Sequence, residues 1–303
     1  MTVSNEVVTV SSEISGARLT RHGMMISGHA YLSGRSNEQV GFEAVLRSVS
    51  GTDREYVFAA SRTRTPDLVD EEGASLPDSG FDLEIVPGEL ADGTPLPSGI
   101  WELWLRVTVG EIRETVRLGV ECTEKVRKER LVHVIGKGES AGPVVGYIAR
   151  GKGFCLDVGG HVFPTEVLRR HVGVSWLPDR DACLRISIEK LPPGLEPSSI
   201  SFRAEDGNGE YIIASPYRDS AEEKPSFILP LETAGEWKIA LRVRQGEDAE
   251  EVHLPPAPSL IARRWRKGLT PWYARPLPAK KGVMGVRVAK VDVIQGLRRR
   301  LGN

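Results

Sequence analysis

The sequence predicts an all-β protein built from two tandem β-sandwich domains. Three observations support this prediction: apolar and polar residues alternate in several short rows, turn-forming residues separate the rows, and the rows recur in the same order in both halves of the chain. The length of 303 residues is typical of two domains, and the 32 Gly and 20 Pro favour many turns.

The alternating rows are typical of half-buried strands, because successive side chains of a strand point to opposite faces of its sheet. The clearest rows, residues 101–107 and 237–243, each begin with a tryptophan that we expect to fill a core. Shorter rows occupy residues 24–32, 40–46 and 184–188. No long helical period accompanies them, so the pattern favours sandwiches.

A degenerate duplication relates the two halves of the chain. The matched segments are 54–59 with 209–214, 81–83 with 227–229, and 98–107 with 234–243. Chance matches would not preserve this order. Each copy spans about 85–105 residues, which is the size of an immunoglobulin-like domain.

We expect four regions along the chain. They are a first sandwich over residues 16–122, a β-hairpin connector over 123–170, a second sandwich over 171–256, and a basic aromatic C-terminal extension over 257–303. Glycine-containing turns between short apolar segments predict the hairpins of the connector.

The formal net charge of −1 hides an uneven distribution. Residues 261–303 hold 12 basic residues and one acidic residue, so this tail carries +11 and the other 260 residues carry −12. Such a split predicts either that the tail packs on the acidic body or that it meets an anionic partner.

Arginines alternate with aromatic residues in the tail, a composition that suits phosphate groups and stacking on rings. Trp104 is a further candidate, because it lies on the polar face opposite Trp101, where the second copy has Ala240. Packing under a loop or against the other domain is the alternative explanation for Trp104. The candidate ligand-binding residues are Trp104, Arg263, Arg264, Trp265, Arg266, Trp272, Tyr273 and Arg275.

No catalytic, metal-binding or cofactor-binding set is identified. Cys122, Cys155 and Cys183 lack the paired spacing of a zinc site, and no histidine lies in a recognisable triad context. The glycine-rich run at 136–140 does not match a phosphate-binding loop, because a further strand follows it instead of a helix. The pattern favours a non-catalytic protein over an enzyme.

The segments 98–107 and 234–243 share the pattern [SA]G-x-W-x-[LI]-x-L-R-V. This pattern resembles the immunoglobulin-like β-sandwich accessory modules of actinobacterial cell-wall glycosyltransferases and CDP-glycerol glycerophosphotransferases. Residues 280–288 are similar to the end of those modules, with Val283 where the family has Asn. Related tandem modules on poly(ribitol-phosphate) glycosyltransferases support trimer formation and polymer association. The catalytic domain has no counterpart here, so the resemblance implies no transferase activity.

We therefore expect a non-catalytic accessory protein that binds a glycan, a phosphorylated cell-envelope polymer or a partner glycosyltransferase, with homo-oligomer formation as a further option. An enzyme with its site at the junction of the two sandwiches, within residues 130–170, is the first alternative, and a structural or assembly subunit is the second. Nucleic acid is disfavoured because no nucleic-acid module pattern occurs. No apolar run is long enough to span a bilayer, and no signal peptide is recognised, which predicts a cytoplasmic location.

Overall fold

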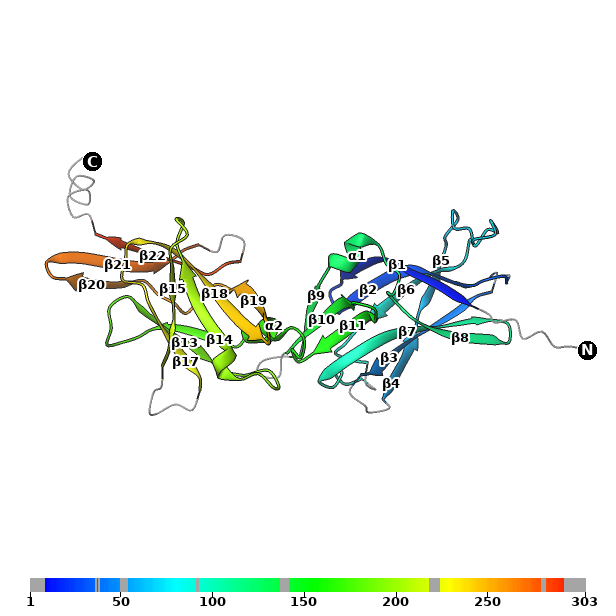
Figure 1. Ribbon diagram of the computed structural model, residues 1–303, viewed down its shortest axis with the longest axis horizontal. Coiled ribbons are helices and arrows are strands. Elements are labelled where there is room, and N and C mark those ends of the chain that lie inside the picture. The colour runs from blue at the N-terminus through cyan, green and yellow to red at the C-terminus, as the bar shows by residue number, and fades with distance from the viewer. Residues whose placement is uncertain are drawn as a thin grey trace, which may run out of the picture. The chain divides into compact units, whose positions relative to one another are not determined.

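The computed structural model describes residues 9–35, 37, 39–49, 54–90, 93–136, 142–217, 224–278 and 282–291. The chain divides into two compact units, Met1–Phe163 and Pro164–Asn303 (Figure 1). Both units consist almost entirely of antiparallel sheets, which confirms the predicted all-β class with tandem sandwiches. The turn at 50–53, most of the glycine-rich run at 136–140, Lys280, Lys281 and residues 292–303 lie outside the described residues.

The first unit packs a four-stranded sheet against a larger one. The smaller sheet has the order β1-β2-β6-β5 and the larger has the order β4-β3-β7-β11-β10-β9, with β8 also paired to β7. The strands are β1 (Val10–Leu19), β2 (Met24–Leu32), β3 (Gly41–Ser48), β4 (Glu55–Ala59), β5 (Ser61–Thr63), β6 (Gly80–Ile85), β7 (Gly99–Val109), β8 (Ile112–Arg117), β9 (Leu131–Ile135), β10 (Gly142–Ala149) and β11 (Gly153–Val158). A short helix, α1 (Glu124–Lys128), precedes β9 and is capped by the Thr123 hydroxyl.

The second unit repeats this arrangement. Its smaller sheet has the order β12-β13-β17-β16, and its larger sheet has the order β15-β14-β18-β22-β21-β20, with β19 also paired to β18. The strands are β12 (Val172–Trp176), β13 (Cys183–Ile188), β14 (Ile200–Glu205), β15 (Tyr211–Ile213), β16 (Ser215–Tyr217), β17 (Ser226–Pro230), β18 (Gly235–Gln245), β19 (Asp248–His253), β20 (Arg263–Lys267), β21 (Thr270–Pro276) and β22 (Gly285–Lys290). The helix α2 (Pro164–Leu168) and a 3-10 turn (Pro197–Ser199) complete it.

The two strand orders correspond one to one, so the duplication extends further than the matched sequence segments. Strands β9–β11 join the larger sheet of the first unit through β7, and β20–β22 join that of the second unit through β18. The structure therefore does not set residues 123–170 apart as a connector, nor 257–291 as an extension: the strands of both segments are equivalent parts of the two sheets. Backbone hydrogen bonds create this pairing, and they leave little trace in side-chain identity.

Each unit has a main apolar core between its two sheets, built from the inward positions of the alternating rows. Trp101 and Trp237 occupy equivalent places and are each 2% exposed, as their alternation predicts. Their indole N–H groups donate to Pro97 O at 3.0 Å and to Thr233 O at 3.3 Å, so burial leaves neither polar atom unpaired.

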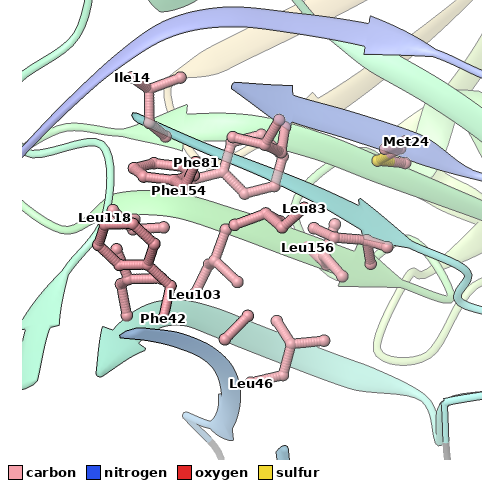
Figure 2. Close-up of a cluster of buried hydrophobic side chains, with 14 of the residues drawn as sticks. Ile14, Met24, Phe42, Leu46, Phe81, Leu83, Leu103, Leu118, Phe154 and Leu156 are labelled. Carbon is pink, nitrogen blue, oxygen red and sulfur yellow. The ribbon is translucent and has the colours of Figure 1, made fainter. Parts of the chain in front are cut away.

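Figure 2 shows how both sheets contribute to the core of the first unit. Phe81 comes from the smaller sheet and Phe42 from the larger one, and their rings meet edge to face with centroids 5.9 Å apart. Phe154 and Leu156 of β11 belong to the same core. β11 lies in the segment predicted as a connector, and it supplies part of the apolar interior of the first unit.

Candidate functional site

Most of the candidate residues lie on the β20–β21 hairpin, whose register decides which way each one faces. Trp265 pairs with Trp272, and Arg264 pairs with Tyr273. Residues directly opposite one another in an antiparallel pair share a face of the sheet. Because Ala274 and Trp272 are buried in the core, the side chains of Arg264 and Tyr273 must lie on the outer face.

The outer face of the hairpin forms a groove of about 690 Å³. Six of the eight candidates line it, and we call this surface the arginine groove. Its lining residues are Ala262, Arg264, Trp265, Arg266, Pro271, Trp272, Tyr273, Arg275 and Val291. The fold therefore brings six of the eight candidate residues to a single surface.

The arginine groove is strongly cationic. Arg264, Arg266 and Arg275 are exposed, and no carboxylate in the described part of the chain lies within ion-pair distance of them. The neighbouring Arg287 differs, because its Nε donates to Glu236 Oε1 at 2.8 Å. The hydrogen bond and charge of Glu236 raise the pKa of Arg287. Three guanidinium groups are thus available to an anionic ligand.

Arg263 and the tryptophans have different surroundings. Arg263 lies on the inner face, and its guanidinium donates to Leu177 O and, at 2.7 Å, to Pro178 O. This arrangement ties β20 to the β12–β13 turn and engages the guanidinium donors of Arg263 within the second unit. Trp265 stacks on Trp272 with centroids 6.2 Å apart and the planes at 19°.

Trp104 belongs to the first unit, whereas the other seven candidates belong to the second. Its ring lies between the guanidinium groups of Arg47 and Arg117, each 4.7 Å from the centroid. Arg47 pairs with Glu55 and Arg117 pairs with Glu102. Arginines of its own unit therefore engage the Trp104 ring, which favours a packing role over ligand contact for this residue.

The alternative hypothesis places an enzyme site within residues 130–170, where Asp157 lies close to His161 and the His161 ring lies close to Ser98. Ser98 Oγ lies 3.0 Å from His161 Nε2, but the hydroxyl is also placed to donate to Val158 O at 3.1 Å. Asp157 accepts hydrogen bonds from the backbone of residues 161–163 rather than from the His161 ring. Burial raises the pKa of Cys155 to about 11, which keeps this thiol protonated at neutral pH.

Sequence reasoning did not identify a second pocket in the second unit, which includes Tyr217, Arg180 and Glu232 beside Trp265. Segments far apart in the sequence form it, so no local pattern could signal it. Among the described residues, no three His, Cys, Asp or Glu side chains are grouped as metal ligands. Within the same residues, no helix is both long and apolar enough to cross a bilayer.

Comparison with known proteins gives one family match. Residues 5–152 match the family model described as the TarS beta-glycosyltransferase C-terminal domain 1. The match spans just under half of the chain and falls within the first unit. The first unit is therefore similar to a C-terminal domain associated with a glycosyltransferase.

Two solved structures are similar at low sequence identity. The crystal structure of S. aureus TarS has 8% identity and a TM-score of 0.41, with 81% of this chain and 40% of that chain covered. The crystal structure of S. aureus TarS 217-571 has 9% identity and a TM-score of 0.39, with 81% and 62% covered. This chain thus spans less than two thirds of either. No curated protein matches the sequence at a significant level.

Proposed function

We propose that this chain is a non-catalytic accessory module that binds a phosphorylated cell-envelope polymer through the arginine groove. The observation that carries the proposal is the set of three exposed arginines, Arg264, Arg266 and Arg275, beside Tyr273 and with no carboxylate partner among the described residues. The family match of the first unit supports a role beside a glycosyltransferase.

The groove suits a ligand with regularly spaced phosphates. A strand rises about 3.4 Å per residue, so side chains two residues apart on one face are about 7 Å apart. Arg264 and Arg266 have this relation along β20. Guanidinium groups bind phosphate oxygens in a bidentate manner, and Tyr273 offers an apolar ring edge to the carbon chain between phosphates. An extended polyol phosphate matches both features.

The equivalent face of the first unit is covered, and this contrast supports a binding role for the arginine groove. There, Asp157 of β11 is fully buried and accepts hydrogen bonds from the backbone N–H groups of His161, Val162 and Phe163 at 2.8–2.9 Å. Phe163 then packs edge to face on Tyr147 with centroids 4.9 Å apart. The first unit thus covers this face with its own chain, whereas the described residues of the second unit leave the arginine groove exposed.

The test is binding of a synthetic poly(glycerol phosphate) oligomer to the full chain, measured by calorimetry over a series of salt concentrations. We expect the double substitution Arg264→Ser, Arg266→Ser to weaken binding by about tenfold or more and to reduce its salt dependence, because two phosphate contacts and their released counterions are lost.

The matched control is the double substitution Arg242→Ser, Arg244→Ser. These arginines are also exposed on an outward face of the second unit, but they lie on β18 opposite Glu251 and Ala249 of β19. The control removes the same charge and should change affinity far less. Equal losses of affinity in the two double variants would show that only net charge matters, and they would reject the arginine groove as the binding site.

A further inference from the structure

The second pocket lies on the other side of β20 and has a volume of about 610 Å³. We call it the Trp265 pocket. Its lining residues are Arg180, Asp181, Ala182, Cys183, Ser215, Pro216, Tyr217, Ile228, Pro230, Glu232, Trp265 and Lys267. Because side chains alternate along β20, Trp265 and Lys267 face this pocket while Arg264 and Arg266 face the arginine groove.

Hydrogen bonds fix the wall that the β12–β13 turn contributes. Arg263 on β20 donates to Leu177 O and Pro178 O, and the Trp176 indole donates to Ile261 O at 2.7 Å. The start of the turn is therefore fastened both to β20 and to the segment just before it. A ligand entering this pocket would meet a wall that is already in place, which lowers the entropic cost of binding.

A strained residue stands in the same wall. Ala182 has a φ of 45°, and it is the one non-glycine residue with positive φ in the described part of the chain. This conformation is unfavourable for a side chain with a Cβ, and strain of this kind concentrates at ligand-binding sites. Ala182 is 1% exposed, and its carbonyl accepts a hydrogen bond from Leu231 N at 2.8 Å. The surrounding structure thus holds the turn in this shape.

The lining combines aromatic rings with charged groups of both signs. Trp265 and Tyr217 supply the rings, and Ile228 and the two prolines supply further apolar surface. One face of Trp265 rests on Trp272. The charged lining residues are Arg180 and Lys267 against Asp181 and Glu232, so their formal charges cancel.

This combination indicates the chemistry of the ligand. The net charge of this pocket does not favour an anion over a neutral molecule, whereas the arginine groove on the other side of β20 would attract an anion. A pyranose ring has an apolar C–H face that packs on an aromatic ring, and hydroxyl groups around its edge that both donate and accept hydrogen bonds. Carboxylates accept from such hydroxyls, and guanidinium and ammonium groups donate to them.

The first unit shows that the fold does not require these aromatic residues. By strand register, the position of Tyr217 corresponds to Thr63 of β5, and that of Trp265 corresponds to Ile135 of β9. Both strands form in the first unit with these smaller side chains. Tyr217 and Trp265 are therefore additions specific to the second unit.

We propose that the Trp265 pocket is a binding site for a neutral saccharide ring, with Trp265 and Tyr217 as the stacking residues and Asp181 and Glu232 as hydroxyl acceptors. This proposal does not rest on polymer binding by the arginine groove. It assigns a different ligand chemistry to a pocket that shares only Trp265 with the lining of the arginine groove.

The experiment is saturation-transfer NMR of the full chain with three neutral probes: methyl glucoside, methyl galactoside and N-acetylglucosamine. We expect transfer to the ring C–H protons of at least one probe. Tyr217→Thr and Trp265→Ile, which install the residues of the first unit, should each weaken the interaction about tenfold, the loss expected for one aromatic stacking contact.

Three further measurements keep the proposal falsifiable. Asp181→Asn and Glu232→Gln leave the apolar wall intact and should also weaken binding, which covers the case in which an aromatic variant fails to fold. Arg264→Ser, Arg266→Ser should leave saccharide binding unchanged, although it weakens polymer binding. Absence of transfer to all three probes would overturn the proposal, and so would transfer that survives every pocket substitution.

Discussion

The two larger sheets carry the same three strands at one side and use their outer faces in opposite ways. Val145 and Asp157 of the first unit are 1% and 0% exposed, and the residues at their positions in the second unit are Arg275 and Arg287. One copy covers the face with residues 161–163, and the other copy leaves it cationic. The difference shows that a face can change from buried interior to exposed cationic surface while the backbone pairing stays the same.

The largest expected effect comes from exchanging residues between the two faces. Val145→Arg would force a guanidinium into a buried, packed position opposite Asp157, whose carboxylate already accepts hydrogen bonds from the backbone of residues 161–163. We expect it to lower the free energy of unfolding of the first unit by about 4 kcal/mol. The reciprocal change, Arg275→Val, should alter stability by less than about 0.5 kcal/mol because its side chain is exposed. Urea unfolding of both variants measures the two changes in the free energy of unfolding. Equal changes would contradict the difference between the two faces.

Loss of the buried carboxylate should have the next largest effect. Asp157→Ala leaves three backbone N–H groups of residues 161–163 without their acceptor, and we expect a loss of about 3 kcal/mol. Arg287→Ala removes an ion pair with Glu236 that is exposed to solvent, so the expected loss is much smaller than that of Asp157→Ala. Faster hydrogen exchange at residues 161–163 in Asp157→Ala would identify the cause, and an unchanged exchange rate would contradict it.

The smallest expected effect is a pH dependence at a third equivalent pair. His133 of β9 corresponds to Arg263 of β20, and burial, followed by the charge of His22, lowers the pKa of His133. The unfolded chain therefore binds its proton more readily than the folded chain. The stability contributed by the neutral ring is full above the unfolded pKa of about 6.5, and it is lost as the pH falls from there through the lower pKa of the folded state.

His133→Gln should accordingly flatten the acid side of the stability profile of the first unit. Urea unfolding between pH 5 and 8 measures the profile, with His253→Gln as the control, because His253 lies exposed on β19. A profile that His133→Gln leaves unchanged would exclude this histidine as the source.

The fold class and part of the lining of the arginine groove could be predicted from the sequence. The period-two rows around Trp101 and Trp237 predicted strands and cores because alternation directly reflects which face is buried. The same alternation separates Arg263 from Arg264 and Arg266, so its inward orientation could have been predicted. The equivalence of β9–β11 with β20–β22 could not have been predicted, because pairs such as Val145 and Arg275 share no side-chain chemistry and only the strand register relates them.

The Trp265 pocket was beyond the reach of local patterns for a different reason. Its walls come from the β12–β13 turn, the β16–β17 pair and β20, which are separated by up to about 85 residues along the chain. Short-range spacing rules describe neighbours on one element, whereas this pocket depends on how distant elements pack. The position of Ala182 in the left-handed region is likewise imposed by its surroundings.

The strand order also determines where this chain can be divided. β10 reaches β7 only through β11, which begins at Gly153, so a fragment that stops at residue 152 would leave β9 and β10 without a sheet to join. It would also lose Phe154 and Leu156 from the apolar core. The shortest N-terminal piece that keeps both the sheet and its own covering segment ends at Phe163, and dissection of the chain for separate study of the two halves should cut after that residue.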